Sequence, residues 1–157
     1  MQDESDFLWG MYQEHTAQGR HHEEQRATVT NFIIIVSGGV LAFITDKGLN
    51  KDQWFLAVFL IIIGLFGALF SLKQYQKFRF HMKVAKAYRN ALEKKIKEDL
   101  ADIRSTAKKN HEDEFPKLLV KIPLFTLWLS FHLLIVLLGL ILLYLVNNIN
   151  VNPTPPL

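Results

Sequence analysis

The hydrophobic positions of this chain fall into three long runs that are separated by polar segments. The runs extend over residues 29–45, 54–72 and 124–146, and none of them contains Asp, Glu, Lys or Arg. At about 1.5 Å of rise per residue, each run comes close to the roughly 20 residues with which a helix crosses about 30 Å of hydrocarbon. The pattern therefore predicts an all-α integral membrane protein with three transmembrane helices, of which the first is the shortest.

Polar segments flank these runs and divide the chain into five parts. The parts are a polar N-terminal helix at 1–28, a transmembrane hairpin at 29–72, a basic connector at 73–122, a third transmembrane helix at 123–146 and a tail at 147–157. Only eight residues, 46–53, join the first two runs. We therefore expect a tight hairpin whose two far ends lie on the same side of the membrane.

Charge is distributed unevenly over these parts. Residues 1–28 carry two basic and six acidic side chains, residues 73–123 carry fourteen basic and seven acidic ones, and the hairpin tip carries two of each. The positive-inside rule then predicts a cytoplasmic N-terminus and connector and an external C-terminal tail. Because the first 28 residues are acidic and lack an apolar core, we expect the first run to act as a retained anchor and not as a cleaved signal peptide.

The connector carries an apolar stripe with helical steps of three and four. Its members are Tyr75, Phe78, Met82, Ala85, Tyr88, Leu92, Ile96, Leu100 and Ile103. No Gly or Pro interrupts residues 68–115, so we expect the second transmembrane helix to continue as a long amphipathic cytoplasmic helix. It either runs straight to Arg104, tilts, or breaks near Arg89 and Asn90. Such a stripe needs cover from the N-terminal segment or from the same helix of another subunit, and we expect an oligomer.

The N-terminal segment has no large hydrophobic residue between positions 13 and 28. A helix that is polar on all sides needs polar partners. Its side chains either make ordinary hydrogen bonds and salt bridges, for example to the basic connector, or recognise a polar or anionic cytoplasmic ligand. The candidate ligand-binding and gating residues are Arg20, His21, His22, Gln25 and Arg26. His15, His21 and His22 are also candidates for a pH sensor, because a histidine pKa of about 6.5 lies near physiological pH.

Within the membrane runs the polar residues are few. On the first run, Thr30, Ser37, Gly38, Ala42 and Thr45 share one helical face. A small and mildly polar face suits either close helix packing or a narrow water-filled pathway. The candidate pore-lining residues are Thr30, Ser37, Thr45 and His132.

His132 is the only ionisable group that we expect at mid-membrane depth. Ionisable residues inside a membrane are functional candidates, and the alternative is a neutral imidazole that is hydrogen-bonded to a carbonyl or to a hydroxyl such as that of Ser130. Gly38, Gly64 and Ala68 are candidate helix-packing residues. The spacing of Gly64 and Ala68 predicts an interhelical contact within the hairpin or between subunits.

Several classes of protein are disfavoured by what the chain contains. It has no cysteine, which excludes disulfides and thiolate chemistry. It also has no nucleophile motif, no phosphate-binding Gly-rich loop and no metal-ligand set, so we expect neither an enzyme nor a metal site nor a cofactor. A proton-coupled transporter would need intramembrane carboxylates and a larger repeated architecture.

The entry segment and the two spans that follow it resemble a known family. The pattern is Tyr12, Glu14 and His15, then Arg20, His21, His22, Glu23, Gln25 and Arg26, then a short span with paired glycines and a second span with a basic helical extension. Over residues 7–105 this layout is similar to small bacterial membrane proteins of the SLATT-like kind, which are two-helix effectors of nucleotide-signalling anti-phage systems. The third run is additional to that plan. The resemblance implies a pore-forming or membrane-disrupting effector that responds to a cytoplasmic signal.

From these observations we expect an oligomeric, multi-pass protein of the bacterial inner membrane with channel-like activity gated by a cytoplasmic signal. Its expected partners are other copies of itself, the lipid bilayer, and a nucleotide or oligonucleotide signal or a cytoplasmic protein, whereas binding to duplex DNA is not expected. Two alternatives stay open. One is a non-conducting scaffold that recruits partners through the basic helix, and the other is a sensor of anionic lipid headgroups.

Overall fold

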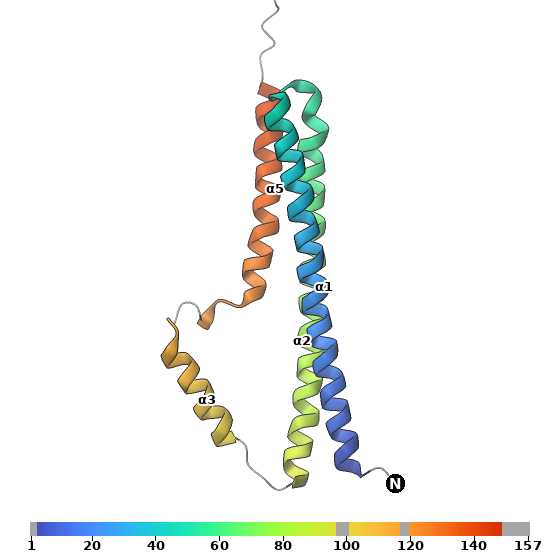
Figure 1. Ribbon diagram of the computed structural model, residues 1–157, viewed down its shortest axis with the longest axis vertical. Coiled ribbons are helices and arrows are strands. Elements are labelled where there is room, and N and C mark those ends of the chain that lie inside the picture. The colour runs from blue at the N-terminus through green and yellow to red at the C-terminus, as the bar shows by residue number, and fades with distance from the viewer. Residues whose placement is uncertain (1–2, 97–100, 117–119, 149–157) are drawn as a thin grey trace, which may run out of the picture. The chain divides into compact units, whose positions relative to one another are not determined.

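The structure is a computed structural model that describes residues 3–96, 101–116 and 120–148. Its elements are α1 (Glu4–Lys47), the 3₁₀ helix η1 (Lys51–Gln53), α2 (Trp54–Ile96), α3 (Ala101–Glu114) and α5 (Leu124–Asn148), as Figure 1 shows. The described ranges contain no strand. Helices α1, α2 and α5 are each long and apolar enough to cross a membrane. The prediction of an all-helical chain with three helices of this length and apolar character is thereby confirmed.

Local sequence explains where α1 begins and ends. The backbone amide of Ser5 donates to the side chain of Asp3 at 3.4 Å, and that of Phe7 donates to the Asp3 carbonyl at 3.2 Å. Acidic residues in the first turn also favour the positive end of the helix dipole. After Lys47 the chain turns at Gly48, whose φ of 73° is a left-handed conformation that glycine adopts at low cost.

The connection to α2 is made by the short helix η1. The backbone amide of Asn50 donates to Oε1 of Gln53 at 3.2 Å, and the amide of Gln53 donates to the Asn50 carbonyl at 3.2 Å. These reciprocal bonds close the hairpin predicted between the first two apolar runs.

The chain folds into two compact units, and α1 and α2 each contribute to both. We call the first the polar unit; it is formed by the described residues of Met1–Arg26 and Leu72–Leu127. We call the second the apolar unit; it is formed by the described residues of Ala27–Ser71 and Trp128–Leu157.

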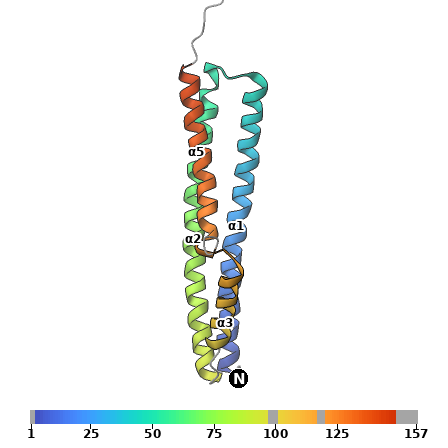
Figure 2. The same cartoon turned by 90° about the vertical axis from the view of Figure 1, so that its left-hand side faces the viewer.

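The apolar unit brings together segments of α1, α2 and α5 (Figures 1 and 2). Ile33, Leu60 and Ile135, one from each helix, form its buried apolar core. Large apolar side chains such as Ile35 and Leu69 are exposed, at 72% and 64%. Helices that are apolar on their outer faces are suited to contact with lipid.

The polar unit pairs the start of α1 with the end of α2 in an antiparallel arrangement. Three side-chain contacts give the register: Glu4 with Lys95, His15 with His81, and His22 with Gln74. The N-terminal segment, one of the two predicted covers, therefore lies against the α2 part of the connector stripe, whereas the stripe member Ile103 on α3 is 68% exposed. Ala85 of the stripe is 1% exposed, and Gly19 of α1 lies against Met82.

The predicted course of the connector needs correction. Helix α2 passes through Arg89 and Asn90 without a break, so the alternative of a hairpin there is wrong. A single helix as far as Arg104 is also wrong, because α2 ends at Ile96 and Arg104 lies on α3, where it pairs with Glu93 of α2. The four residues 97–100, which include the predicted stripe member Leu100, lie outside the described ranges.

The last predicted segment is only partly described. Residues 147 and 148 continue α5, and the remainder of the predicted tail, 149–157, lies outside the described residues.

Candidate functional site

The five candidate ligand-binding residues of α1 point in different directions. His22 is half-buried, and its Nδ1 lies 2.8 Å from Oε1 of Gln74 on α2. Arg26, one turn later, is 1% exposed. Arg20 and His21 are exposed, and Nε2 of Gln25 lies 2.9 Å from Nε2 of His21. The polar segment therefore has one face against α2 and another facing outward.

Arg20 belongs to a separate surface feature. It borders an open depression of about 540 Å³ on α1 that is lined also by Trp9, Tyr12 and Gln13. The five candidates therefore do not form a single site within the polar unit.

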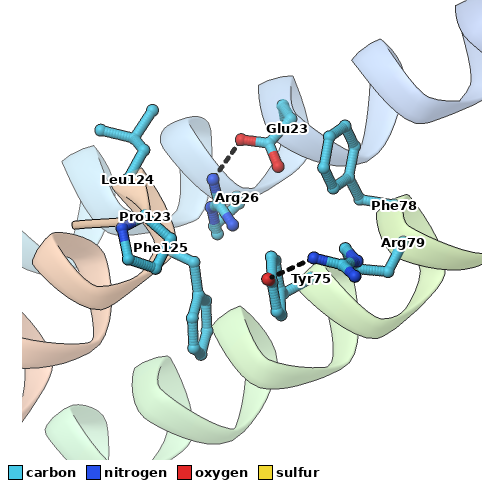
Figure 3. Close-up of a pocket in the computed structure, with 8 residues that line it drawn as sticks. All are labelled: Glu23, Arg26, Tyr75, Phe78, Arg79, Pro123, Leu124 and Phe125. Atoms are coloured by element: carbon cyan, nitrogen blue, oxygen red, sulfur yellow. Dashed lines mark hydrogen bonds and ion pairs between the residues drawn. The ribbon is translucent and has the colours of Figure 1, made fainter. Parts of the chain in front are cut away.

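Arg26 lies at a second cavity, of about 420 Å³, which Figure 3 shows in close-up. Its lining comes from α1, α2 and the chain that enters α5, and comprises Glu23, Arg26, Tyr75, Phe78, Arg79, Pro123, Leu124 and Phe125. The Tyr75 and Phe125 rings stack with their centroids 4.2 Å apart and an interplanar angle of 12°. This stack ties the start of α5 to α2 and forms one wall of the cavity.

The guanidinium of Arg26 is only partly satisfied. Its Nη2 donates to Glu23 one turn earlier on α1, whereas Nε and Nη1 are buried and have no hydrogen-bond partner within the described part of the chain. Buried donors without partners are costly, and more so on a charged group. Across the cavity, Nη1 of Arg79 donates to the Tyr75 hydroxyl at 3.3 Å. The cavity thus has one buried and one exposed guanidinium.

A histidine cluster lies further along the same helix pair. Nδ1 of His15 is 3.0 Å from Nδ1 of His81, and the His15 ring stacks on Tyr88. The rings of His22 and His81 have centroids 5.3 Å apart. One of the two Nδ1 atoms must accept the hydrogen bond, so protonating both imidazoles removes the contact.

The surroundings of His81 favour its neutral form. His81 lies beyond the apolar run 54–72 of α2, outside the membrane-spanning segments. Burial lowers its pKa, and the charges of His15, His22 and Lys77 lower it further, while Glu14 acts in the opposite direction. Within the described ranges, no three His, Asp or Glu side chains are arranged as metal ligands.

In the apolar unit, the His132 side chain contacts α1. It is 1% exposed, and its Nε2 lies 3.2 Å from the hydroxyl of Thr30, which is also 1% exposed. A hydroxyl beside the imidazole is thus supplied by a residue that is 102 positions away in the sequence. The imidazole occupies the space beside Gly67 of α2, because a Cβ built there would lie 2.3 Å from Nδ1 of His132.

The other pore-lining candidates on α1 differ in exposure. Ser37 is 5% exposed, and its hydroxyl has no hydrogen-bond partner in the described ranges. Thr45 is exposed, and its hydroxyl donates to the Leu41 carbonyl at 2.9 Å. Thr30 and Ser37 therefore face the interior of their own chain, on either side of the core residue Ile33.

The three helix-packing candidates also differ in what surrounds them. A Cβ on Gly64 would lie 2.8 Å from a Val136 methyl group and 3.0 Å from the Val136 backbone nitrogen, so Gly64 packs on α5. The predicted contact within the hairpin or between subunits is thus, for Gly64, a contact to the third helix. Ala68 is buried, with 7% of its surface exposed, whereas a Cβ on Gly38 would have nothing within 4 Å.

Three residues of these sites were not singled out from the sequence. Gly139 of α5 lies against α2, where an added Cβ would be 2.9 Å from the Ala57 carbonyl oxygen. It is the lone glycine of the run 124–146, and this could have indicated a close helix contact. His81 is next to the stripe member Met82, but its partner His15 is 66 residues away. Gln74 had no distinguishing sequence signal.

Comparison with known proteins gave no match. Neither the protein-family models, nor the curated proteins, nor the solved structures include one that matches this chain.

Proposed function

We propose that this protein is an oligomeric effector of the bacterial inner membrane whose channel-like activity is controlled from the polar unit. The observation that supports it is the order of layers inside the apolar unit. The polar pair Thr30 and His132 lies one helical turn from the apolar layer of Ile33, Leu60 and Ile135. Apolar constrictions beside polar cavities gate conduction by dewetting.

Unpartnered polar atoms support a wet path through this unit. Three buried groups, the hydroxyls of Ser37 and Ser71 and Nδ1 of His132, have no hydrogen-bond partner among the residues that the structure describes. In hydrocarbon each such group costs several kcal/mol. Water that enters the bundle supplies the missing hydrogen bonds, since buried water commonly bridges unsatisfied polar groups.

The control element is the polar unit. Its excess of basic residues favours the cytoplasmic side, and its α1 segment continues directly into the apolar unit through Arg26 and Ala27. A ligand that changes the packing of α1 on α2 therefore acts on the helix that carries Thr30. The resemblance to SLATT-like proteins adds a defence or stress context to this proposal.

A non-conducting scaffold is the second candidate, and one observation favours it. Thr30 and Ser37 face the core of their own chain, so α1 presents only Thr45 of its predicted pore-lining residues on an exposed surface. A pore formed between subunits along that face of α1 would have a sparse polar lining.

Ion flux through proteoliposomes distinguishes the two. Ile33→Thr places a hydroxyl in the apolar layer, and Ile35→Thr makes the same change on the same helix at a side chain that is 72% exposed. We expect Ile33→Thr to raise flux at least tenfold over wild type and Ile35→Thr to leave it unchanged. If the wild type and Ile33→Thr are both impermeant while both remain folded by circular dichroism, the scaffold takes the place of the channel.

A further inference from the structure

The cavity beside Arg26 is lined by a buried guanidinium whose donors are only partly used. Nε and Nη1 of Arg26 together carry three N–H groups that have no partner among the described residues, and the side chain that holds them is 2% exposed. Figure 3 shows this guanidinium pointing into the space between Glu23, Tyr75 and Phe125. A buried cation whose free donors line a cavity is stabilised by an acceptor that enters that cavity.

The net charge of the side chains at the cavity is positive and therefore favours a negative group. Glu23 neutralises one guanidinium through its bond to Nη2 of Arg26, and Arg79 adds a second positive charge. The three side chains together therefore carry one net positive charge. The remaining walls, from Tyr75, Phe125 and Leu124, are aromatic or apolar, which suits a ligand that joins an anionic group to a less polar one.

The position of the cavity along the chain indicates which anion it meets. Arg26 precedes the apolar run 29–45 by three residues, Tyr75 follows the run 54–72 by three, and Leu124 opens the run 124–146. All three helices thus reach the cavity within about one turn of an apolar boundary, where the phosphates of a bilayer leaflet lie. Basic pockets between membrane helices at this depth bind lipid headgroups.

We infer that the cavity binds a phosphate group through Arg26, with Arg79 as a second contact, and that this group comes from an anionic phospholipid of the adjoining leaflet or from a soluble phosphate compound. The inference rests on the proposed function, because it names the chemical class of the signal that the polar unit receives. Its test measures binding, so it succeeds or fails independently of ion flux.

Native mass spectrometry of the whole protein in detergent measures this binding, with phosphatidylglycerol and phosphatidylcholine as probes. We expect selective retention of phosphatidylglycerol by wild type and at least a tenfold loss in Arg26→Gln. Arg26→Lys keeps the charge and loses the planar fork of donors, so we expect an intermediate value. The control, Lys86→Gln, removes one exposed positive charge of α2 outside the cavity and should bind as wild type does.

Two further variants keep the test decisive if Arg26→Gln does not fold. Arg79→Gln changes an exposed side chain and should weaken binding about threefold, and Leu124→Trp should weaken it by filling the cavity. Competition with millimolar inorganic phosphate separates the sources. Displacement of the lipid supports a soluble phosphate ligand, and Arg-dependent binding that phosphate does not displace supports the phospholipid. If phosphatidylglycerol binds no better than phosphatidylcholine and phosphate does not bind, or if no cavity variant changes binding, the inference is wrong.

Discussion

Replacing Gly67 by alanine should displace His132 and weaken the apolar unit. The added Cβ would lie 2.3 Å from Nδ1 and 2.5 Å from Cε1 of the imidazole, and 2.7 Å from Cδ1 of Ile33. Real Cβ atoms do not approach so closely, so the ring must move. Because the same ring contacts the Thr30 hydroxyl at 3.2 Å, the movement also disrupts that hydrogen bond.

The size of the effect follows from three terms. Overpacking a core by one methyl group costs about 1–3 kcal/mol, and a hydrogen bond between membrane helices contributes about 0.6 kcal/mol. Against these, alanine gains up to about 1 kcal/mol over glycine in a helix interior. Gly39→Ala has only the gain in helix propensity, because a Cβ at Gly39 would meet nothing within 4 Å. We therefore expect Gly67→Ala to be about 1.6–3.6 kcal/mol less stable than Gly39→Ala.

Denaturant unfolding in mixed micelles, followed by circular dichroism, gives the two free energies of unfolding. The double mutant of Gly67→Ala and His132→Ala tests the contact directly, since His132→Ala removes the ring with which the new methyl group overlaps. In that background, Gly67→Ala should cost at least about 1 kcal/mol less than it does alone, roughly the coupling found for residues in contact. Equal stabilities of Gly67→Ala and Gly39→Ala, or the absence of coupling to His132, would refute the packing described for this site.

Three further outcomes are expected. The folded-state pKa of His81 lies below its unfolded value, so the folded state binds fewer protons and its stability falls as pH drops through about 6.5. The melting temperature should therefore be lower at about pH 5.5 than at about pH 7.5, and this difference should be smaller in His81→Gln. An equal difference in both proteins would contradict the prediction. Gly139→Ala should destabilise the apolar unit by about 1–3 kcal/mol, because the nearest atoms include the Ala57 carbonyl oxygen at 2.9 Å, which belongs to the backbone and cannot rotate away; a variant with unchanged unfolding would show that α2 and α5 are further apart. A C-terminal alkaline phosphatase fusion should be active and a C-terminal fluorescent protein dark if the tail is external, and the reverse pattern would overturn the proposed topology.

The contact of Gly64 decides which positions can test the proposed oligomer. If its predicted contact lay between subunits, Gly64→Leu would disrupt the assembly. Gly64 instead packs on Val136 of its own chain, so the substitution would unfold the apolar unit whether or not subunits associate. A test of the proposed oligomer needs exposed positions such as Ile35 or Leu69.

The sequence alone was sufficient for the features that each segment determines by itself. The length of the apolar runs and the lack of Gly and Pro after residue 68 predict long helices, because backbone hydrogen bonding and hydrocarbon thickness act on one segment at a time. The eight-residue turn at 46–53 and the antiparallel hairpin followed from the same local information. The end of α2 at Ile96 was not predicted, since the sequence near Ile96 contains neither Gly nor Pro.

The candidate site could be predicted by residue type but not by arrangement. Residues 20–26 are polar on all sides, and a helix of that kind has no apolar face from which its buried side could be predicted. Packing against α2 determines which side is buried: His22 and Arg26 are covered, and Arg20 and His21 are exposed. In the same way Thr30 and His132, which are 102 positions apart, meet only because Gly67 lets a third helix admit the imidazole. Such contacts depend on the relative rotation of whole helices, which packing between helices determines and periodicity within one helix does not.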